Sequence, residues 1–266
     1  MDVKDKLLKI ELPGHAFYKE EMTGRTLTEL EVKKLAALTH GDNIKGIVQL
    51  LNDAVSNDLF ELYTDDFWYL MWWLRVQTFP SYPIVVPWTC KCGAENKSDL
   101  TADKLKYIDI PEEFNPLHAQ VRLSNGELIS IRPQKVKDEF DVDAYLKQRM
   151  IKDPDRSIKG VLLDLACLGE GKTIDDLYKS YKAGNFSTED FFTIQGFKTL
   201  YTWGVNKIAD FSCYKCKEGV SVEYEVTLTN FFPDILHREY LKQRILFNVP
   251  STPTEEPVRD DGLQRV

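Results

Sequence analysis

The residues best suited to chemistry in this chain are four cysteines that occur in two close pairs. Cys90 and Cys92 are separated by one residue, and Cys213 and Cys216 by two. Each pair follows an apolar, partly β-branched run and precedes a polar stretch, so we expect each pair at the tip of a β-hairpin. If the two tips meet, four thiolates can surround one Zn²⁺, and such a closed site leaves no position open for a substrate. The sequence therefore predicts a structural zinc site at Cys90, Cys92, Cys213 and Cys216.

This spacing differs from that of short-range zinc motifs. About 120 residues separate the two pairs, so the metal would close a long insertion, and the first pair is one residue shorter than the usual C-x-x-C. The alternative is that the thiols stay reduced and pack as small hydrophobic side chains. Cys167 is a fifth, unpaired cysteine in an apolar helical pattern. Five cysteines and a start that does not resemble a signal peptide lead us to expect a reducing compartment.

Composition indicates a globular protein whose partners are proteins. The chain has 266 residues, of which 43% are hydrophobic, and this is ample for a sizeable core. A formal charge of −8 opposes general binding to polyanions, which requires clustered Lys and Arg. The longest apolar run, from Phe67 to Leu74, is well short of the roughly 20 residues that a membrane span requires. We therefore expect no membrane crossing.

Periodicity and capping signals predict a mainly helical chain with small β elements. Helical patterns cover residues 28–40, 42–55, 64–74, 139–150, 158–168, 173–182, 187–207 and 233–245. Asn125-Gly126 predicts a hairpin at 120–131, because this dipeptide accepts the positive φ angles of a tight turn. Residues 220–228 alternate between apolar and polar, which is the period of a strand with one buried face.

The predicted fold class is α+β, mostly helical, with the two cysteine hairpins forming a discontinuous zinc ribbon around a β-hairpin and helical insertion. The expected parts are an extended N-terminal arm (1–25), a helical region (26–84), the first half of the ribbon (85–100), the insertion (101–207), the second half of the ribbon (208–229), a C-terminal amphipathic helix (230–250) and a tail (251–266). The tail has almost no apolar content, so we expect it to be disordered unless a neighbour orders it.

The sequence gives no catalytic constellation, and we expect no enzyme. Gly171-Lys172-Thr173 matches the end of a phosphate-binding loop, but Ala166 stands where that motif requires its first glycine. The residues before it have helical spacing, so a helix–turn–helix is the simpler interpretation. Four scattered histidines form no i, i+4 pair. The acidic run at 138–141 is typical of a helix start. The aromatic run at 67–74 lacks the interleaved basic residues of a base-stacking surface and is assigned to the core or to a subunit contact.

A series of short motifs in the first half of the chain is distinctive in its order. It comprises Leu12-Pro13 followed by Tyr18, Thr28 with Glu31 at a helix start, Asp65-Asp66 before an aromatic helix ending in Leu74-Arg75, then Ser81-Tyr82 and Cys90-x-Cys92-Gly93. This series resembles the T-even-type bacteriophage baseplate hub family. Pro83 replaces a glycine of the family pattern, and the helical insertion has no counterpart in it.

The resemblance implies a non-enzymatic structural or assembly component of a phage tail baseplate. It also implies assembly in the host cytoplasm, a final location in the virion, and partners among the hub, tube and tape-measure proteins. The alternative is a zinc-ribbon regulator that binds nucleic acid, in which Lys91, Lys215 and Lys217 contact phosphates.

Overall fold

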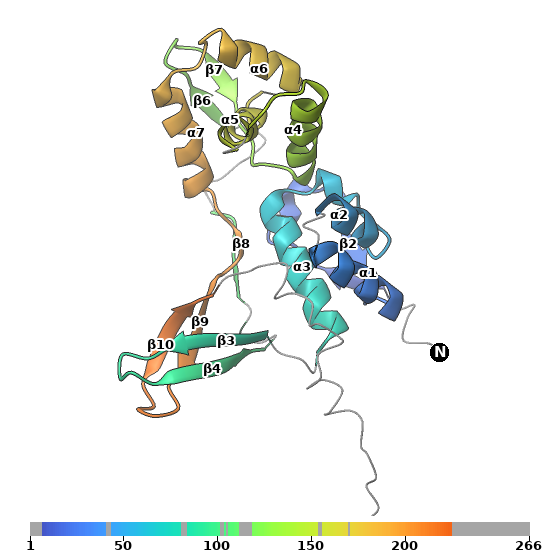
Figure 1. The fold of residues 1–266 in the computed structure, drawn as a ribbon, viewed down its shortest axis with the longest axis vertical. Coiled ribbons are helices and arrows are strands. Elements are labelled where there is room, and N and C mark those ends of the chain that lie inside the picture. Colours follow the sequence, from blue (N-terminus) through green and yellow to red (C-terminus); the bar gives the residue numbers. More distant parts are fainter. Residues whose placement is uncertain are drawn as a thin grey trace, which may run out of the picture. The chain divides into compact units, whose positions relative to one another are not determined.

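The computed structural model describes residues 7–40, 44–80, 84–101, 104, 106–111, 119–153, 156–169 and 171–224. Within these residues there are seven α-helices, two 3-10 helices and ten short strands, and the strands pair into five two-stranded antiparallel sheets (Figure 1). The mixed α+β class is confirmed, and each of the seven α-helices corresponds to a predicted one. The predicted C-terminal helix and tail, the ribbon beyond residue 224 and the Ser81-Tyr82 motif lie outside the described residues.

The N-terminal segment is a hairpin and not the extended arm expected from the sequence. Strand β1 (Leu8–Ile10) pairs with β2 (Met22–Gly24), and a short 3-10 helix (His15–Phe17) lies in the loop between them. The reversal follows the Pro13-Gly14 turn. It also satisfies backbone groups that a lone strand of three residues would leave without partners.

Three helices form the next part of the chain. They are α1 (Glu29–His40), α2 (Ile44–Asn52) and α3 (Thr64–Thr78). The predicted capping box at α1 is confirmed, because the Glu31 carboxylate accepts the Thr28 N–H at 2.7 Å and the Glu31 N–H donates to Thr28 Oγ1 at 3.3 Å. Helix α2 buries Ile47, Val48 and Leu51 on one face. Helix α3 is buried on several sides, and its core residues are Phe67, Leu70, Met71, Trp72 and Leu74.

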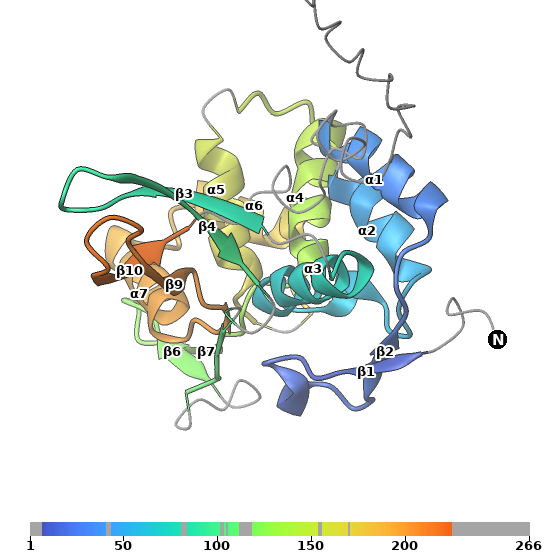
Figure 2. The same cartoon turned by 90° about the horizontal axis from the view of Figure 1, so that it is seen from below.

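The first cysteine hairpin follows α3, and the second follows the insertion. The first is built from β3 (Ile84–Thr89) and β4 (Glu95–Leu100), and the second from β9 (Ile208–Ser212) and β10 (Gly219–Glu223). Figure 2 shows the two hairpins next to each other, as Figure 1 does. Between them, β5 (Tyr107–Ile108) leads into the insertion and pairs with β8 (Gly204–Val205), which leads out of it. This pairing brings the two ends of the insertion together.

The insertion contains a β-hairpin and four helices around their own apolar core. Strands β6 (Gln120–Arg122) and β7 (Leu128–Ser130) flank the predicted turn, in which Gly126 has a φ of +86°. The helices are α4 (Val136–Gln148), α5 (Ser157–Ala166), α6 (Ile174–Lys182) and α7 (Thr188–Leu200). Ile129, Leu165, Ile194 and Trp203 are among the buried residues of this core, and Tyr63 from the preceding part of the chain joins them.

The last helix of the insertion is shorter than predicted. Helical spacing suggested that it reaches residue 207, but α7 ends at Leu200. Trp203 turns into the interior, where it is only 1% exposed, and Gly204 has a φ of +96°. A Cβ at Gly204 would lie 2.9 Å from the backbone oxygen of Asp65, so the close approach of α3 requires a glycine there. Contacts with α3 therefore outweigh the local helical pattern.

Candidate metal centre

The first cysteine pair lies in the five residues that connect β3 and β4. The Cys90 N–H donates to the Ala94 carbonyl at 2.9 Å, and the Gly93 N–H donates to the Cys90 carbonyl at 2.9 Å. Gly93 has a φ of +80°, a conformation that glycine adopts without steric cost. These bonds place Cys90 at the end of β3 and Cys92 in the turn itself. The predicted hairpin tip is confirmed.

The second pair lies in a similar turn between β9 and β10. The Cys213 N–H donates to the Glu218 carbonyl at 2.9 Å, and the Lys217 N–H donates to the Cys213 carbonyl at 3.0 Å. Lys217 has a φ of +63°, so a non-glycine residue takes the left-handed conformation that closes this turn. Cys213 is therefore at the end of a strand and Cys216 is in the turn, as in the first hairpin.

The structure brings the four predicted cysteines together, although Cys92 and Cys213 are 121 positions apart in the sequence. All four Sγ atoms lie within 4.8 Å of one another, with Cys90 and Cys216 3.6 Å apart and Cys92 and Cys213 3.7 Å apart. Zn–S bonds of about 2.3 Å in a tetrahedron place neighbouring sulfurs about 3.8 Å apart. The four thiols are close enough, and of the right chemistry, to hold one metal ion.

Each hairpin supplies one buried and one exposed cysteine. Cys90 and Cys213 are 3% and 0% exposed, whereas Cys92 and Cys216 are exposed. The strand-end cysteines are thus buried and the turn cysteines exposed, while the sulfurs of all four converge on one point. Cys167 is separate from this group: it is buried after α5, and its Sγ donates to the Leu163 carbonyl at 3.4 Å.

Backbone amides favour the thiolate form of Cys213. The Cys216 N–H, and after it the Lys215 N–H, points toward the Cys213 sulfur and lowers the pKa of this thiol to about 6. A hydrogen bond to the charged form stabilises that form, and a metal binds the thiolate rather than the thiol. These bonds therefore favour the form of Cys213 that binds a metal.

Two contacts outside the cysteines dock one hairpin on the other. The rings of Trp88 in β3 and Phe211 in β9 are stacked, with centroids 6.4 Å apart and planes inclined by 19°. The side chain of Asn96 in β4 accepts the Tyr214 N–H at 3.0 Å and donates to the Ala94 carbonyl at 2.9 Å. Sequence reasoning missed Asn96. The available signal was an asparagine within a strand, where this residue is depleted.

A second polar centre, which the sequence did not predict, joins three segments of the chain at Asp66. This carboxylate is 0% exposed and accepts hydrogen bonds from the Gly14 N–H at 2.8 Å, the Tyr18 hydroxyl at 2.6 Å and the Trp203 Nε1–H at 3.1 Å. We call this cluster the Asp66 joint. The sequence assigned Asp65-Asp66 to a helix start, where acids are favourable. Burial raises the pKa of Asp66, and the hydrogen bonds oppose that rise.

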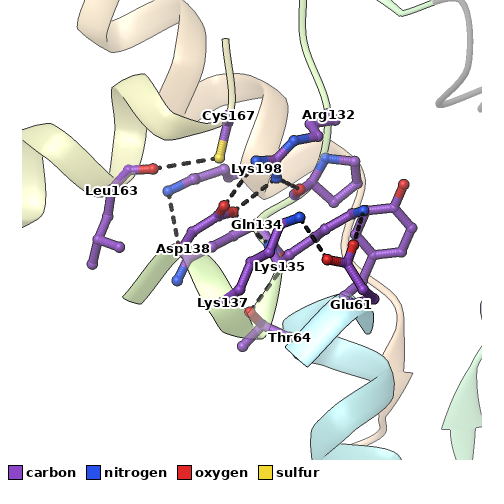
Figure 3. Close-up of polar contacts among 12 residues, drawn as sticks. Glu61, Thr64, Arg132, Gln134, Lys135, Lys137, Asp138, Leu163, Cys167 and Lys198 are labelled. Atoms are coloured by element: carbon purple, nitrogen blue, oxygen red, sulfur yellow. Dashed lines mark hydrogen bonds and ion pairs between the residues drawn. The ribbon is translucent and has the colours of Figure 1, made fainter. Parts of the chain in front are cut away.

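A polar strip also connects the insertion with the segment before α3 (Figure 3). The Nζ atoms of Lys135 and Lys137 lie 2.9 and 2.6 Å from the Glu61 carboxylate, and the Thr64 N–H donates to the Gln134 carbonyl. Beside it, Arg132 forms a two-bond ion pair with Asp138 at 2.8 Å for each bond. Asp138 belongs to a helix start, as predicted, but it is buried and paired rather than solvated.

The Gly171-Lys172-Thr173 segment connects two helices, as predicted. It lies between α5 and α6, and Thr173 is the N-cap of α6: its Oγ1 accepts the Asp176 N–H at 3.2 Å and donates to the Asp176 carboxylate at 2.6 Å. A phosphate-binding loop instead follows a strand and uses its hydroxyl on a metal ion. Here the hydroxyl is occupied by the capping box.

Comparisons with protein-family models, with curated proteins and with solved structures give no significant match to this chain. None of the helices in the described ranges combines the length and the apolar character that crossing a bilayer requires.

Proposed function

We propose that one structural Zn²⁺ is bound by Cys90, Cys92, Cys213 and Cys216. We also propose that the chain stabilised in this way is a non-enzymatic structural or assembly component of a phage tail baseplate. The observation that carries the metal site is the convergence of four sulfurs from two hairpins far apart in the sequence. Thiolates are soft ligands that select zinc among the abundant divalent ions. Four of them complete a tetrahedral shell, which is typical of a site that stabilises a fold.

The baseplate assignment rests on the order of motifs in the sequence, and the contacts of those motifs support it. Tyr18 and the Gly14 amide, next to the Leu12-Pro13 motif, bond to Asp66 of the Asp65-Asp66 motif. Arg75, from the motif that ends the aromatic helix, is buried. Residues that carry the resemblance therefore belong to one physical unit, the N-terminal hairpin packed on α3. A shared series of this kind is expected when relatives keep a common packing arrangement.

The metal site is tested with two matched cysteine variants of the full chain. Purified wild-type protein should contain one zinc per chain by elemental analysis. Cys213→Ser should lose the zinc and become insoluble or unstable, because the other three thiols cannot complete the tetrahedron. Cys167→Ala, which removes a buried thiol outside the cluster, should keep the zinc. Soluble, folded wild-type protein without metal would contradict the site.

The baseplate assignment needs a separate experiment. Mass spectrometry of purified tailed particles from the source virus should find this polypeptide in a fixed ratio to the tube protein. An assembly factor would instead be present in tail precursors and absent from finished particles. If normal particles assemble when the Cys213→Ser variant replaces all of the wild-type protein, the zinc-stabilised fold has no role in tail assembly.

Exposed lysines at the cysteine turns favour a second candidate, a zinc-ribbon protein that binds nucleic acid. Lys91, Lys215 and Lys217 are all exposed there, beside the exposed ring of Tyr214. Phosphate contacts release counterions, so binding to DNA or RNA would weaken steeply as salt rises. A gel shift that depends on salt and is abolished by Lys91→Ala with Lys215→Ala would support this candidate. A gel shift absent at low salt would exclude it.

A further inference from the structure

In the metal centre, the Sγ atom of each exposed cysteine lies next to the Sγ atom of a buried cysteine in the opposite hairpin. Cys92 lies 3.7 Å from Cys213, and Cys216 lies 3.6 Å from Cys90. We propose that oxidation converts this centre into two disulfides between the hairpins, Cys92–Cys213 and Cys90–Cys216, so that the hairpins stay fastened when the metal leaves. The inference rests on the proposed zinc site and adds a second, covalent state to it.

The chemistry requires a two-electron oxidant, for which a peroxide suffices. The exposed thiolate attacks one peroxide oxygen, the O–O bond breaks, and a sulfenic acid and hydroxide form. The buried thiolate of the other hairpin then attacks this sulfur and displaces a second hydroxide as the S–S bond forms. Each disulfide thus takes two electrons from two thiolates and reduces one peroxide. Sulfurs in a disulfide no longer carry the negative charge that holds zinc, so the ion is released as Zn²⁺.

Packing between the hairpins favours these cross-pairs over links within each hairpin. The Trp88–Phe211 stack and the bond from the Tyr214 N–H to Asn96 hold the two turns together independently of a metal. A disulfide has sulfurs about 2.05 Å apart, so each cross-pair must close by about 1.6 Å. Side-chain rotation supplies much of such a movement while the strands remain docked. The two cross-pairs also use all four sulfurs and leave none for further oxidation.

The two states suit different surroundings. Thiolates and bound zinc persist in a reducing compartment, whereas disulfides persist outside it. A chain that is assembled inside a cell and later exposed outside would keep its two distant hairpins joined in both places. The insertion between them would stay closed at its base throughout.

The sequence offers a direct way to read the pairing. Lys91 separates Cys90 from Cys92, and Lys215 separates Cys213 from Cys216, so trypsin places the four cysteines on four different peptides. The full chain carrying Cys167→Ala is first analysed for zinc, then treated with hydrogen peroxide, alkylated and digested without reduction. We expect complete zinc release, loss of four hydrogens from the intact mass, and two cross-linked peptide pairs, Cys90 with Cys216 and Cys92 with Cys213.

Several outcomes separate this inference from the metal site on which it rests. Zinc-loaded protein that gives Cys90–Cys92 and Cys213–Cys216 links, or sulfinic acids without links, would overturn the inference and leave the metal site standing. Folded protein without zinc would overturn the metal site itself. As a second variant, Cys92→Ser should still form the Cys90–Cys216 link and leave Cys213 open to alkylation. A Cys213–Cys216 link in that variant would also contradict the inference.

Discussion

At the scale of single residues, the carboxylate of Asp66 is the group on which the most distant segments depend. Its three hydrogen-bond donors belong to the N-terminal loop and to the exit of the insertion. The loop approaches so closely that a Cβ on Gly14 would lie 2.0 Å from Asp66 Oδ2. Phe17, Tyr63 and Trp203 pack edge to face around this point, with centroids 5.4 to 5.8 Å apart. Asp66 is therefore held in a dry, aromatic environment.

Removing this carboxylate should be among the most destabilising single changes. Asp66→Ala leaves the Gly14, Tyr18 and Trp203 donors buried without their acceptor, and we expect a loss of about 3–5 kcal/mol in the free energy of unfolding. Tyr18→Phe removes one donor and also the acceptor of the Tyr63 N–H, so it should cost about 1–2 kcal/mol. Urea denaturation measures both. Equal losses for the two variants would show that Asp66 does not join the segments as described.

Asp65, the neighbour of Asp66, should make the folded state less stable as pH rises. Burial, and after it the charge of Asp66, raises the pKa of Asp65 to about 6 from an ordinary value of 3.8. Between these two values the folded state holds a proton that the unfolded state has released. The stabilising contribution is therefore complete below about pH 4 and is lost as pH rises through about 6.

Asp65→Asn removes this dependence, because the amide does not ionise. The variant should exceed the wild type in unfolding free energy by about 1–2 kcal/mol at pH 7.5. This is less than the free energy that corresponds to the full rise in the pKa of Asp65, because the side chain is partly exposed. At pH 4 the two proteins should be equally stable. Chemical denaturation at several pH values gives the difference curve. A flat difference between pH 4 and 7.5 would contradict the assigned burial cost.

At the scale of elements, a capping residue in the insertion also binds a neighbouring element. Ser187 and Asp190 form a capping box at α7, and the Asp190 carboxylate also accepts the Ser124 N–H at 2.6 Å and the Ser124 hydroxyl at 2.9 Å. Asp190 is only 2% exposed, and burial by itself would raise the pKa of its carboxyl. The hydrogen bonds from Ser187 and Ser124 outweigh burial and lower this pKa. One residue thus caps α7 and anchors the turn between β6 and β7.

A comparison of two capping boxes tests this double role. Asp190→Ala should cost about 2–4 kcal/mol, because the cap is lost and the Ser124 groups lose their acceptor in a closed environment. Asp176→Ala removes the equivalent acid from α6, where the carboxylate bonds only to Thr173 among the described contacts, and should cost about 1 kcal/mol. Thermal unfolding of both variants is the measurement. Similar costs would show that the Ser124 contact adds nothing.

At the scale of the whole molecule, the chain between the hairpins is closed at its base by the cluster of four cysteines and by the β5–β8 pair. The helical part of the insertion has other supports: its own apolar core, the Asp66 joint and the polar strip at Glu61. None of these supports involves Cys90, Cys92, Cys213 or Cys216. The two regions should therefore respond differently when the metal is removed.

Chelation should loosen the cysteine hairpins and spare the insertion. After treatment with a zinc chelator under reducing conditions, amide hydrogen exchange should increase in β3, β4, β9 and β10. The four cysteines then no longer bind a common metal ion, and structural zinc contributes directly to folding free energy. Exchange in α4 to α7 should change little. Equal loss of protection throughout the chain would instead mean that the metal controls the cooperative unfolding of the entire fold.

Local patterns in the sequence sufficed to place the seven described α-helices, apart from the end of α7, and to identify the candidate ligands. The capping boxes at Thr28, Thr173 and Ser187 and the Asn125-Gly126 turn depend on neighbours within a few residues, so sequence order alone specifies them. Two pairs of thiols at hairpin tips are likewise a local signal, and their chemistry has few alternatives to a shared metal.

Only the tertiary structure decided how distant segments meet. Asp66 resembles any acid at a helix start until Gly14, Tyr18 and Trp203 surround it, and α7 ends early because Trp203 and Gly204 pack against α3. The N-terminal segment forms a hairpin because its loop has a buried acceptor to bind. These outcomes depend on burial and on contacts across dozens to more than a hundred residues, and burial is a property of the folded chain that no local pattern contains.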